Sequence, residues 1–290
     1  MIFTDLRRNY HSFYSRMTQN FFFSHPNPNI LARTVNEELK KVIQWIYANK
    51  LSLNIQKTKV MLFSNSLDSL PSNISFDTSP LEEVSSFKFL GVCVDNKLSW
   101  KSHIENICKI ISRNIGVMNR LKYYLPSSAL LTLYSSMILP YLNYGILAWG
   151  NTYQTLLDKL FLFQKKALRI VFNLHPREHT EALFFDHKIL KIKDLYVFQL
   201  GQFMFNYNVN FLPKIFHDLF YRNSHVHNYP TRRSDEFHLP LMRTAHAQNT
   251  FLYTGPTLWN NLDNSLKDSP KFVTFKYKFR KYLLSTYNTS

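Results

Sequence analysis

The sequence predicts an α+β protein that is mainly helical, and three observations support this prediction. Hydrophobic residues make up 45% of the 290 residues, which is enough to fill the core of one or two domains. Apolar residues recur at helical spacing through most of the chain after residue 100. Before that point, short apolar runs alternate with polar turns, as is typical of strands.

The first third of the chain combines one helix with short strands. Residues 1–29 show neither helical nor strand periodicity, so we expect an irregular segment there. Residues 34–50 place apolar side chains at helical spacing, and Glu37 and Glu38 lie early in this run, where the helix dipole favours acids. These features predict an amphipathic helix. We expect the strands at residues 53–55, 60–63 and 85–94.

The remaining two thirds of the chain are predicted to form a bundle of helices. In the first of them, isoleucines at positions 104, 107, 111 and 115 recur every three or four residues. Between residues 224 and 248 the pattern breaks up, and this segment is either a linker with a functional arm or, as we favour, a long surface loop. We expect helices at residues 100–121, 127–139, 156–172, 189–207 and 272–287.

Charge points to an anionic partner. The chain has 35 Lys and Arg against 19 Asp and Glu, a net charge of +16, which favours nucleic acid or an anionic membrane. No long uninterrupted apolar run and no basic leader followed by an apolar stretch occur, so we expect no membrane association and no secretion. The only two cysteines, Cys93 and Cys108, suit a reducing compartment. We therefore expect a nuclear or cytoplasmic protein that binds RNA, DNA or a hybrid.

Five sequence runs occur in an informative order. They are NKLSLNIQKTKVMLF at 49–63, FKFLGV at 87–92, LSWKSHI at 98–104, YLNYG at 141–145 and GPTLWN at 255–260. Together they resemble the reverse transcriptases of non-LTR retrotransposons, LINE-like elements of the jockey/CR1 type. The resemblance extends from about residue 30 to the end of the chain.

The resemblance implies how the chain divides. Residues 1–29 would contain a degenerate active-site turn, and residues 30–97 the C-terminal part of the polymerase palm. Residues 98–212 would form a helical, thumb-like region, and residues 213–290 a C-terminal region with a loop and a basic final helix. The implied fold is an incomplete palm edge, made of a helix and short strands, followed by a helical bundle.

The residues needed for polymerisation are missing from this chain. The family holds two Mg²⁺ ions with an early palm aspartate and the paired aspartates of a Tyr/Phe-Ala-Asp-Asp turn, because this chemistry requires clustered carboxylates. The corresponding run here is YSRM at 14–17, in which Arg16 would repel a metal, and the nearby Asp5 is expected on the surface. We expect no catalytic residues, no metal and no cofactor in this chain, although the intact family would use Mg²⁺.

Asn54, Lys57 and Thr58 belong to the run that the family places beside its active site. The resemblance implies that Lys57 would lie near the departing pyrophosphate, where a lysine can neutralise developing charge. Without metal ions it has nothing to assist. The alternative, which we favour for this chain, is an exposed lysine in a turn.

Phe89, Leu90 and Gly91 belong to the run that corresponds to the hairpin called the primer grip in this family. Leu90 is either a core residue of an alternating strand or part of a surface where Gly91 allows the backbone to approach the primer. Both alternatives remain open.

Basic residues on the predicted helices are candidates for phosphate contacts, as in the thumb of the family. The alternative is a solvated helix face, but few acids lie among them, so we favour a nucleic-acid surface. The last helix has a similar group at Lys276, Lys278, Arg280 and Lys281. The main candidates are Lys101, Lys109, Arg113, Arg120, Lys122, Lys165, Lys166 and Arg169.

The resulting hypothesis is a truncated RNA-directed DNA polymerase from a transposable element, inactive alone, that retains nucleic-acid binding. One alternative is a helical interaction or structural protein whose open palm edge pairs with another chain, such as the missing polymerase half. The other is the end of an active reverse transcriptase whose reading frame begins upstream of Met1.

Overall fold

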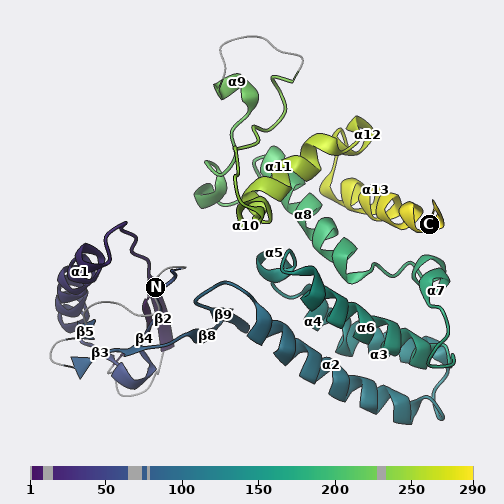
Figure 1. Ribbon diagram of the computed structural model, residues 1–290, viewed down its shortest axis with the longest axis horizontal. Coiled ribbons are helices and arrows are strands. Elements are labelled where there is room, and N and C mark those ends of the chain that lie inside the picture. The colour runs from purple at the N-terminus through teal and green to yellow at the C-terminus, as the bar shows by residue number, and fades with distance from the viewer. Residues whose placement is uncertain (1, 9–15, 65–73, 77–78, 227–232, 290) are drawn as a thin grey trace. The chain divides into compact units, whose positions relative to one another are not determined.

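The chain forms two compact units, Met1–His103 and Ile104–Ser290, in the computed structural model (Figure 1). No helix in the part of the chain that the structure describes is long and apolar enough to cross a membrane. The structure describes residues 2–8, 16–64, 74–76, 79–226 and 233–289.

The first unit contains one long helix, α1 (Pro28–Ala48). Its start is specified locally: the side chain of Asn27 accepts hydrogen bonds from the backbone N–H groups of Asn29 and Ile30, and proline occupies the first helical position. The predicted amphipathic helix is therefore confirmed and begins six residues earlier than its periodicity indicates. Its buried face consists of Ala32, Val35, Leu39, Ile43 and Ile46.

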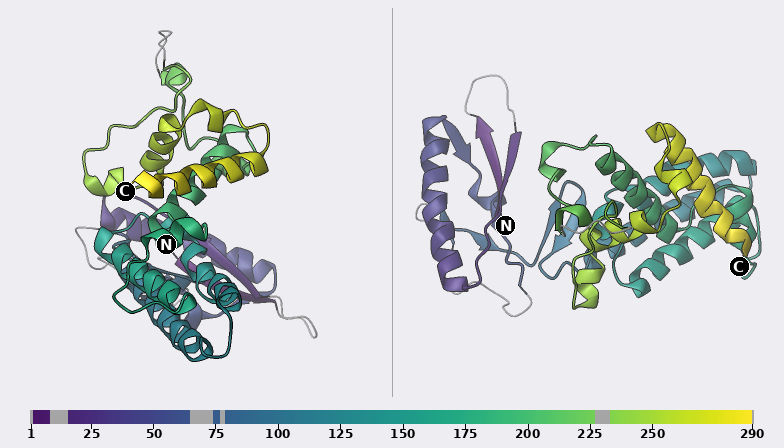
Figure 2. Two further views of the ribbon diagram at one scale, coloured as in Figure 1. Left: turned by 90° about the vertical axis from the view of Figure 1, so that its right-hand side faces the viewer. Right: turned by 90° about the horizontal axis from the view of Figure 1, so that it is seen from above.

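A five-stranded sheet lies beside α1 in the first unit (Figure 2). Strand β1 pairs antiparallel with β2 along one edge and with β3 and β4 along the other, and β7 runs parallel to β4. Residues before position 29, expected to be irregular, thus supply two strands, because their pairing partners come partly from distant sequence. The strands are β1 (Ile2–Arg8), β2 (Arg16–Phe21), β3 (Leu51–Leu53), β4 (Lys59–Val60) and β7 (Glu82–Glu83).

The core of the first unit lies between α1 and these strands. Leu51 and Val60 are buried against the helix, together with Ile74, Phe76 and Leu81. Two further short strands, β5 (Ser75–Phe76) and β6 (Ser79–Pro80), pair with each other, and the N–H of Ser75 donates to the side chain of Asn36 on α1. The fold of this unit therefore depends on contacts between segments far apart in sequence.

Residues 85–94, predicted as a single strand, form a hairpin instead. Strands β8 (Ser86–Phe89) and β9 (Val92–Asp95) pair antiparallel across the two-residue turn Leu90–Gly91. Both turn residues have positive φ, 45° and 85°, as a type I′ hairpin turn requires. The single strand predicted from periodicity was wrong because the alternating pattern continues through the turn. The hairpin that the family resemblance implies for this run is present.

His103 links this hairpin to the following helix, α2 (Lys101–Leu121). Its buried ring accepts a hydrogen bond at Nδ1 from the N–H of Cys93, at 3.3 Å. Burial lowers the pKa of His103, which favours the neutral ring that this bond requires.

The second unit is helical, and every helix expected after residue 100 is present within a few residues of its predicted bounds. The long helices are α2, α3 (Ser127–Met137), α6 (Gln154–Val171), α8 (Ile192–Asn208), α11 (Phe251–Asn261) and α13 (Phe272–Ser285). Short helices connect them: α4 (Leu139–Asn143), α5 (Ile146–Trp149), α7 (Glu181–Asp186), α9 (Asn223–Val226), α10 (Ala245–Gln248) and α12 (Asn264–Lys267).

Helix α8 lies at the centre of the second unit and is buried on nearly all sides. Helices α11 and α13 pack against it, so residues after 213 share one compact unit with the helices before them. Gly201 makes this packing possible, since a Cβ atom there would lie 2.2 Å from the ring of Phe279. The ring of Phe205 stacks on that of Phe275, with 4.6 Å between centroids.

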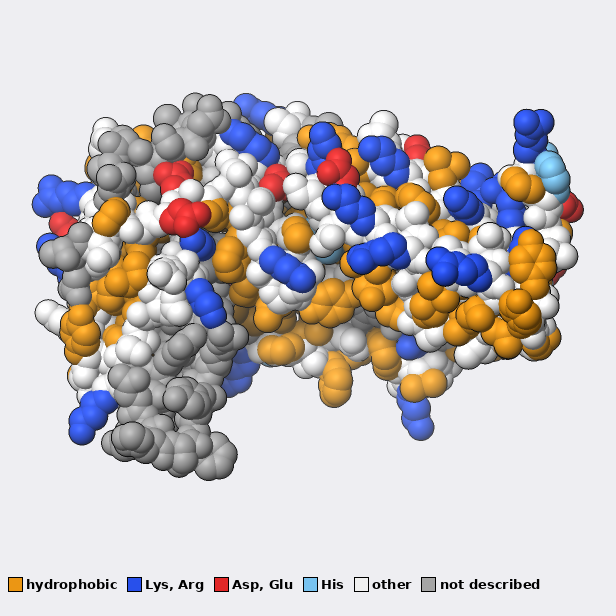
Figure 3. All heavy atoms as spheres, turned by 90° about the horizontal axis from the view of Figure 1, so that it is seen from below, with side chains coloured by type: hydrophobic (Ala, Val, Ile, Leu, Met, Phe, Trp, Pro, Cys, Tyr) orange, Lys and Arg blue, Asp and Glu red, His pale blue; other side chains and the backbone are white. Residues whose placement is uncertain are grey.

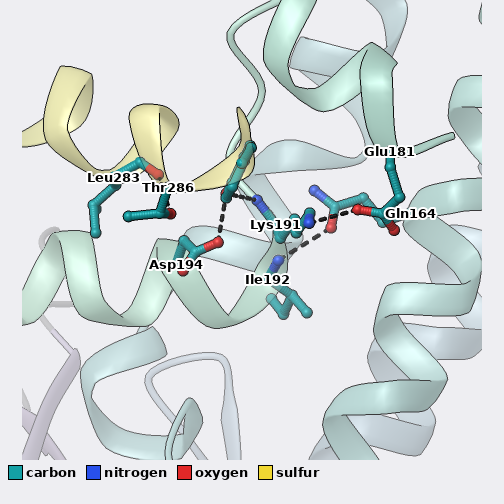
Figure 4. A network of polar contacts seen from close by, with 8 residues as sticks. Gln164, Glu181, Lys191, Ile192, Asp194, Leu283 and Thr286 are labelled. Atoms are coloured by element: carbon teal, nitrogen blue, oxygen red, sulfur yellow. Dashed lines mark hydrogen bonds and ion pairs between the residues drawn. The ribbon is translucent and has the colours of Figure 1, made fainter. Parts of the chain in front are cut away.

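The end of the chain is attached to α8 by polar contacts (Figure 4). The hydroxyl of Tyr287 donates to the carboxylate of Asp194 and accepts from the N–H of Lys191 at 3.0 Å. The Lys191 ammonium lies 2.5 Å from the Glu181 carboxylate. Burial raises the pKa of Asp194, and burial together with the Asp194 contact raises the pKa of Tyr287.

Candidate nucleic-acid interface

The residues nearest the expected catalytic centre form a local turn. The Asn54 side chain accepts from the N–H of Lys57 at 3.1 Å, and the Thr58 hydroxyl donates to the Asn54 carbonyl at 2.9 Å. Thr58 is completely buried, whereas Lys57 is exposed on the 3₁₀ turn Ile55–Lys57. Asn54 and Thr58 therefore shape the turn, and Lys57 is the exposed residue of these three.

Two residues of the run at 14–17, expected to be a degenerate active-site turn, lie among the described residues: Arg16 and Met17, at the start of β2. Arg16 is the first residue of β2 and lies opposite Arg7, while Asp5 on β1 lies opposite Thr18. Residues 14 and 15 lie outside the described residues. In the described part of the chain, no group of three or more His, Cys, Asp or Glu side chains is placed to hold a metal ion.

The predicted primer-grip residues lie at the tip of the β8–β9 hairpin. Phe89 is half-buried at the end of β8, while the side chain of Leu90 is 73% exposed and Gly91 is also exposed. Leu90 is therefore not a core residue of an alternating strand, which was one of the two alternatives for this position. The tip offers backbone and an apolar side chain to solvent.

Helix α2 presents a basic face. Lys109, Arg113 and Arg120 are exposed and lie on one side, because spacings of four and seven residues return to the same side of a helix. The opposite side, from Ile104 to Met118, is buried. Figure 3 views the molecule from the side on which α2 lies in Figure 1, and Lys and Arg side chains follow one another there with few acidic side chains between them.

Lys101 and Lys122 lie at the two ends of α2. Lys101 is exposed at the first residue of the helix, whereas Lys122 is half-buried just beyond the last one. The Lys122 ammonium lies 5.1 Å from the centre of the Tyr123 ring, a cation–π contact.

The three candidates on α6 have different environments. Lys166 is exposed, but Lys165 is half-buried with its ammonium 4.6 Å from the centre of the Phe161 ring. The guanidinium of Arg169 donates to the carbonyl of Glu178 at 2.8 Å and so supports the loop after α6. Lys166 is therefore the α6 candidate most available to a partner.

A groove between α2 and α6 brings two of the candidates together. It has a volume of about 390 Å³, and Lys109 and Lys166 both line it. Cys108 lies on the same surface, and burial raises the pKa of its thiol. The other lining residues are Glu105, Lys159, Leu162 and Phe163.

The sequence-based candidates omit Lys159. Its spacing of seven residues from Lys166 places both on one face of α6, a signal that the sequence does contain. Only the packing of α6 beside α2 shows that this face borders Lys109. Three lysines thus surround a largely apolar floor, with Glu105 as the single acid among the lining residues.

The basic residues of the last helix are partly used in packing. Arg280 donates to the carbonyl of Lys188 at 2.8 Å, and Lys278 donates to the carbonyl of Ser265 at 3.3 Å. Lys276 and Lys281 are exposed on α13. This helix therefore offers fewer available cations than the α2–α6 surface.

Comparisons with known proteins identify relatives. No family model and no solved structure matches the chain. The RNA-directed DNA polymerase from mobile element jockey of Drosophila melanogaster is 27% identical over 171 residues, which cover 57% of this chain and 19% of that protein. The same enzyme from Drosophila funebris is 26% identical over 163 residues, covering 55% of this chain and 18% of the relative.

A third relative is the probable RNA-directed DNA polymerase from transposon BS of Drosophila melanogaster, 25% identical over 150 residues that cover 49% of this chain and 16% of the relative. The matched regions thus span less than a fifth of each relative. These similarities confirm the resemblance seen in the sequence motifs: the chain is related to the reverse transcriptases of non-LTR retrotransposons.

Proposed function

We propose that this chain is the nucleic-acid-binding C-terminal part of a reverse-transcriptase polypeptide and that α2 and α6 contact the phosphates. The observation that carries the proposal is the set of exposed cations along α2 and around its groove with α6. Lys109, Arg113, Lys159 and Lys166 are exposed, and Glu105 is the single acid that lines the groove. Such a surface attracts the negative charges of a polyanion, and few acidic side chains are there to repel them.

In this proposal the first unit is the end of the palm and the second unit includes the thumb. The ordered motifs, the α1–β3–β4 succession and the helical second unit support this assignment. The exposed Leu90–Gly91 tip would contact the primer strand through its backbone. RNA, DNA and a hybrid are all candidate ligands, since phosphate contacts do not distinguish bases.

We expect binding by the whole chain to weaken steeply with salt. Each phosphate that a cation neutralises contributes about −0.9 to the slope of log affinity against log salt, so four contacts predict a slope of roughly −3.6. Fluorescence anisotropy of a labelled RNA–DNA hybrid, measured across a salt series with circular dichroism as the folding check, tests this. An affinity that does not change with salt would contradict the proposal.

We also propose that this chain alone does not polymerise. Arg16 stands where the family motif has an aspartate, and the chain contains no Asp-Asp pair. Without clustered carboxylates, the two metal ions that this chemistry requires have no binding site. Purified chain, mixed with template, primer, deoxynucleotides and Mg²⁺, is expected to extend no primer above a blank without protein. Extension that persists after a second purification and disappears on Mg²⁺ removal would overturn this proposal.

A further inference from the structure

The turn after α2 exposes two neighbouring aromatic rings. Tyr123 and Tyr124 are 77% and 83% exposed. The backbone beneath them is fixed: the N–H groups of Tyr124 and Leu125 both donate to the carbonyl of Leu121, at 2.9 and 3.0 Å. The rings therefore project from an ordered turn between two helices.

The residues that flank this turn in the sequence include cations and no acid. Arg120 is exposed one turn before the rings, and the Lys122 ammonium contacts the Tyr123 ring. No Asp or Glu occurs between Glu105 and Asp158, a stretch that includes most of α2 and all of α3. Exposed aromatic rings beside cations are the combination that binds single-stranded nucleic acid, because bases stack on the rings while cations neutralise the adjacent phosphates.

The rings follow directly after the end of α2, the helix that carries the basic face. From Lys109 to Leu121 the helix rises about 18 Å at 1.5 Å per residue. One nucleic-acid strand advances about 3.4 Å per nucleotide, so a backbone held at Lys109 and followed along α2 would reach the rings after about five nucleotides. A paired segment would present only its terminal base to the rings, whereas an unpaired extension would present several base faces.

We propose that Tyr123 and Tyr124 form a stacking platform for unpaired bases that extend from the end of a nucleic acid bound along α2. This inference rests on the proposed function of the α2–α6 surface. The ligand class is a hybrid or duplex with a single-stranded extension. Base recognition at this platform is sequence-tolerant, because every base has a face that can stack.

The test compares a blunt RNA–DNA hybrid with the same hybrid carrying a single-stranded extension of about five nucleotides. The native chain is expected to bind the extended hybrid roughly tenfold more tightly, given the usual strength of base–aromatic stacking. The double variant Tyr123→Leu/Tyr124→Leu should lose this preference and keep its affinity for the blunt hybrid. The variant Tyr123→Phe/Tyr124→Phe keeps the rings and should keep the preference.

Tyr277→Leu on α13 is the matched control, since this ring is 71% exposed but lies on another helix. A 2-aminopurine in the extension reports stacking directly, because its fluorescence should be quenched by the native and phenylalanine forms but not by the leucine form. If the native chain binds the blunt hybrid with no preference for the extension, or if the leucine variant keeps the preference, the platform is disproved while the proposed function stands. If the native chain binds neither hybrid, both proposals fail.

Discussion

Replacing Lys109, Arg113, Lys159 and Lys166 by glutamine is expected to abolish most of the chain's affinity for nucleic acid. Removing four phosphate contacts should make the salt slope shallower by about 3.6, which corresponds to a loss of about three and a half orders of magnitude in affinity near 0.1 M salt. All four side chains are exposed or line the open groove, and glutamine keeps a polar, helix-compatible side chain. Folding should therefore be preserved, as circular dichroism can verify.

A control variant removes the same charge from other parts of the second unit. Lys193, Lys271, Lys276 and Lys281 are exposed and lie outside the α2–α6 groove, so their replacement by glutamine lowers the net charge equally. This control should lose only the modest affinity that follows from overall charge. Equal losses in the two variants would mean that binding follows net charge rather than the α2–α6 surface, and the proposed interface would be rejected.

The substitution Gln164→Met should destabilise the second unit by about 3 kcal/mol, because it leaves several buried polar groups without partners. The Gln164 amide donates to the Tyr134 hydroxyl at 2.9 Å and to the Leu190 carbonyl at 2.8 Å, and it accepts from the N–H of Ile192 at 3.1 Å. The side chain is completely buried and joins α3, α6 and the start of α8. Figure 4 shows the last of these contacts.

Burial raises the pKa of Tyr134 to about 12, so its hydroxyl stays protonated and can serve this network at any physiological pH. Urea unfolding followed by circular dichroism measures the loss for Gln164→Met. The matched control is Gln154→Met, which changes an exposed glutamine at the start of the same helix and should alter stability by less than about 0.5 kcal/mol. Equal stability of the two variants would show that the buried amide network contributes little.

The helices could be predicted from sequence because their signal is local. The isoleucines of α2 recur at helical spacing, and the buried residues Ile104, Ile107, Ile111 and Ile115 are those that the spacing selects. The strands near the N-terminus could not be predicted in this way. β1 pairs with β3 and β4, some fifty residues away, and such pairing leaves no periodic signal within residues 1–29.

The turn at Leu90–Gly91 shows the same limit on a smaller scale. Leucine has no preference for positive φ, so the alternating pattern of residues 85–94 indicates a continuous strand. The paired backbone on both sides of the turn imposes that conformation on Leu90 and exposes its side chain.

For the candidate interface, the sequence alone establishes the excess of positive charge, the helix faces on which Lys109, Arg113 and Lys166 lie, and the family to which the motifs point. It does not establish that Lys159 joins Lys109 across a groove or that the rings of Tyr123 and Tyr124 stay uncovered. Helix faces follow from residue spacing within one segment, whereas grooves and exposed turns depend on which distant segments pack beside that face. Long-range packing alone sets those neighbours.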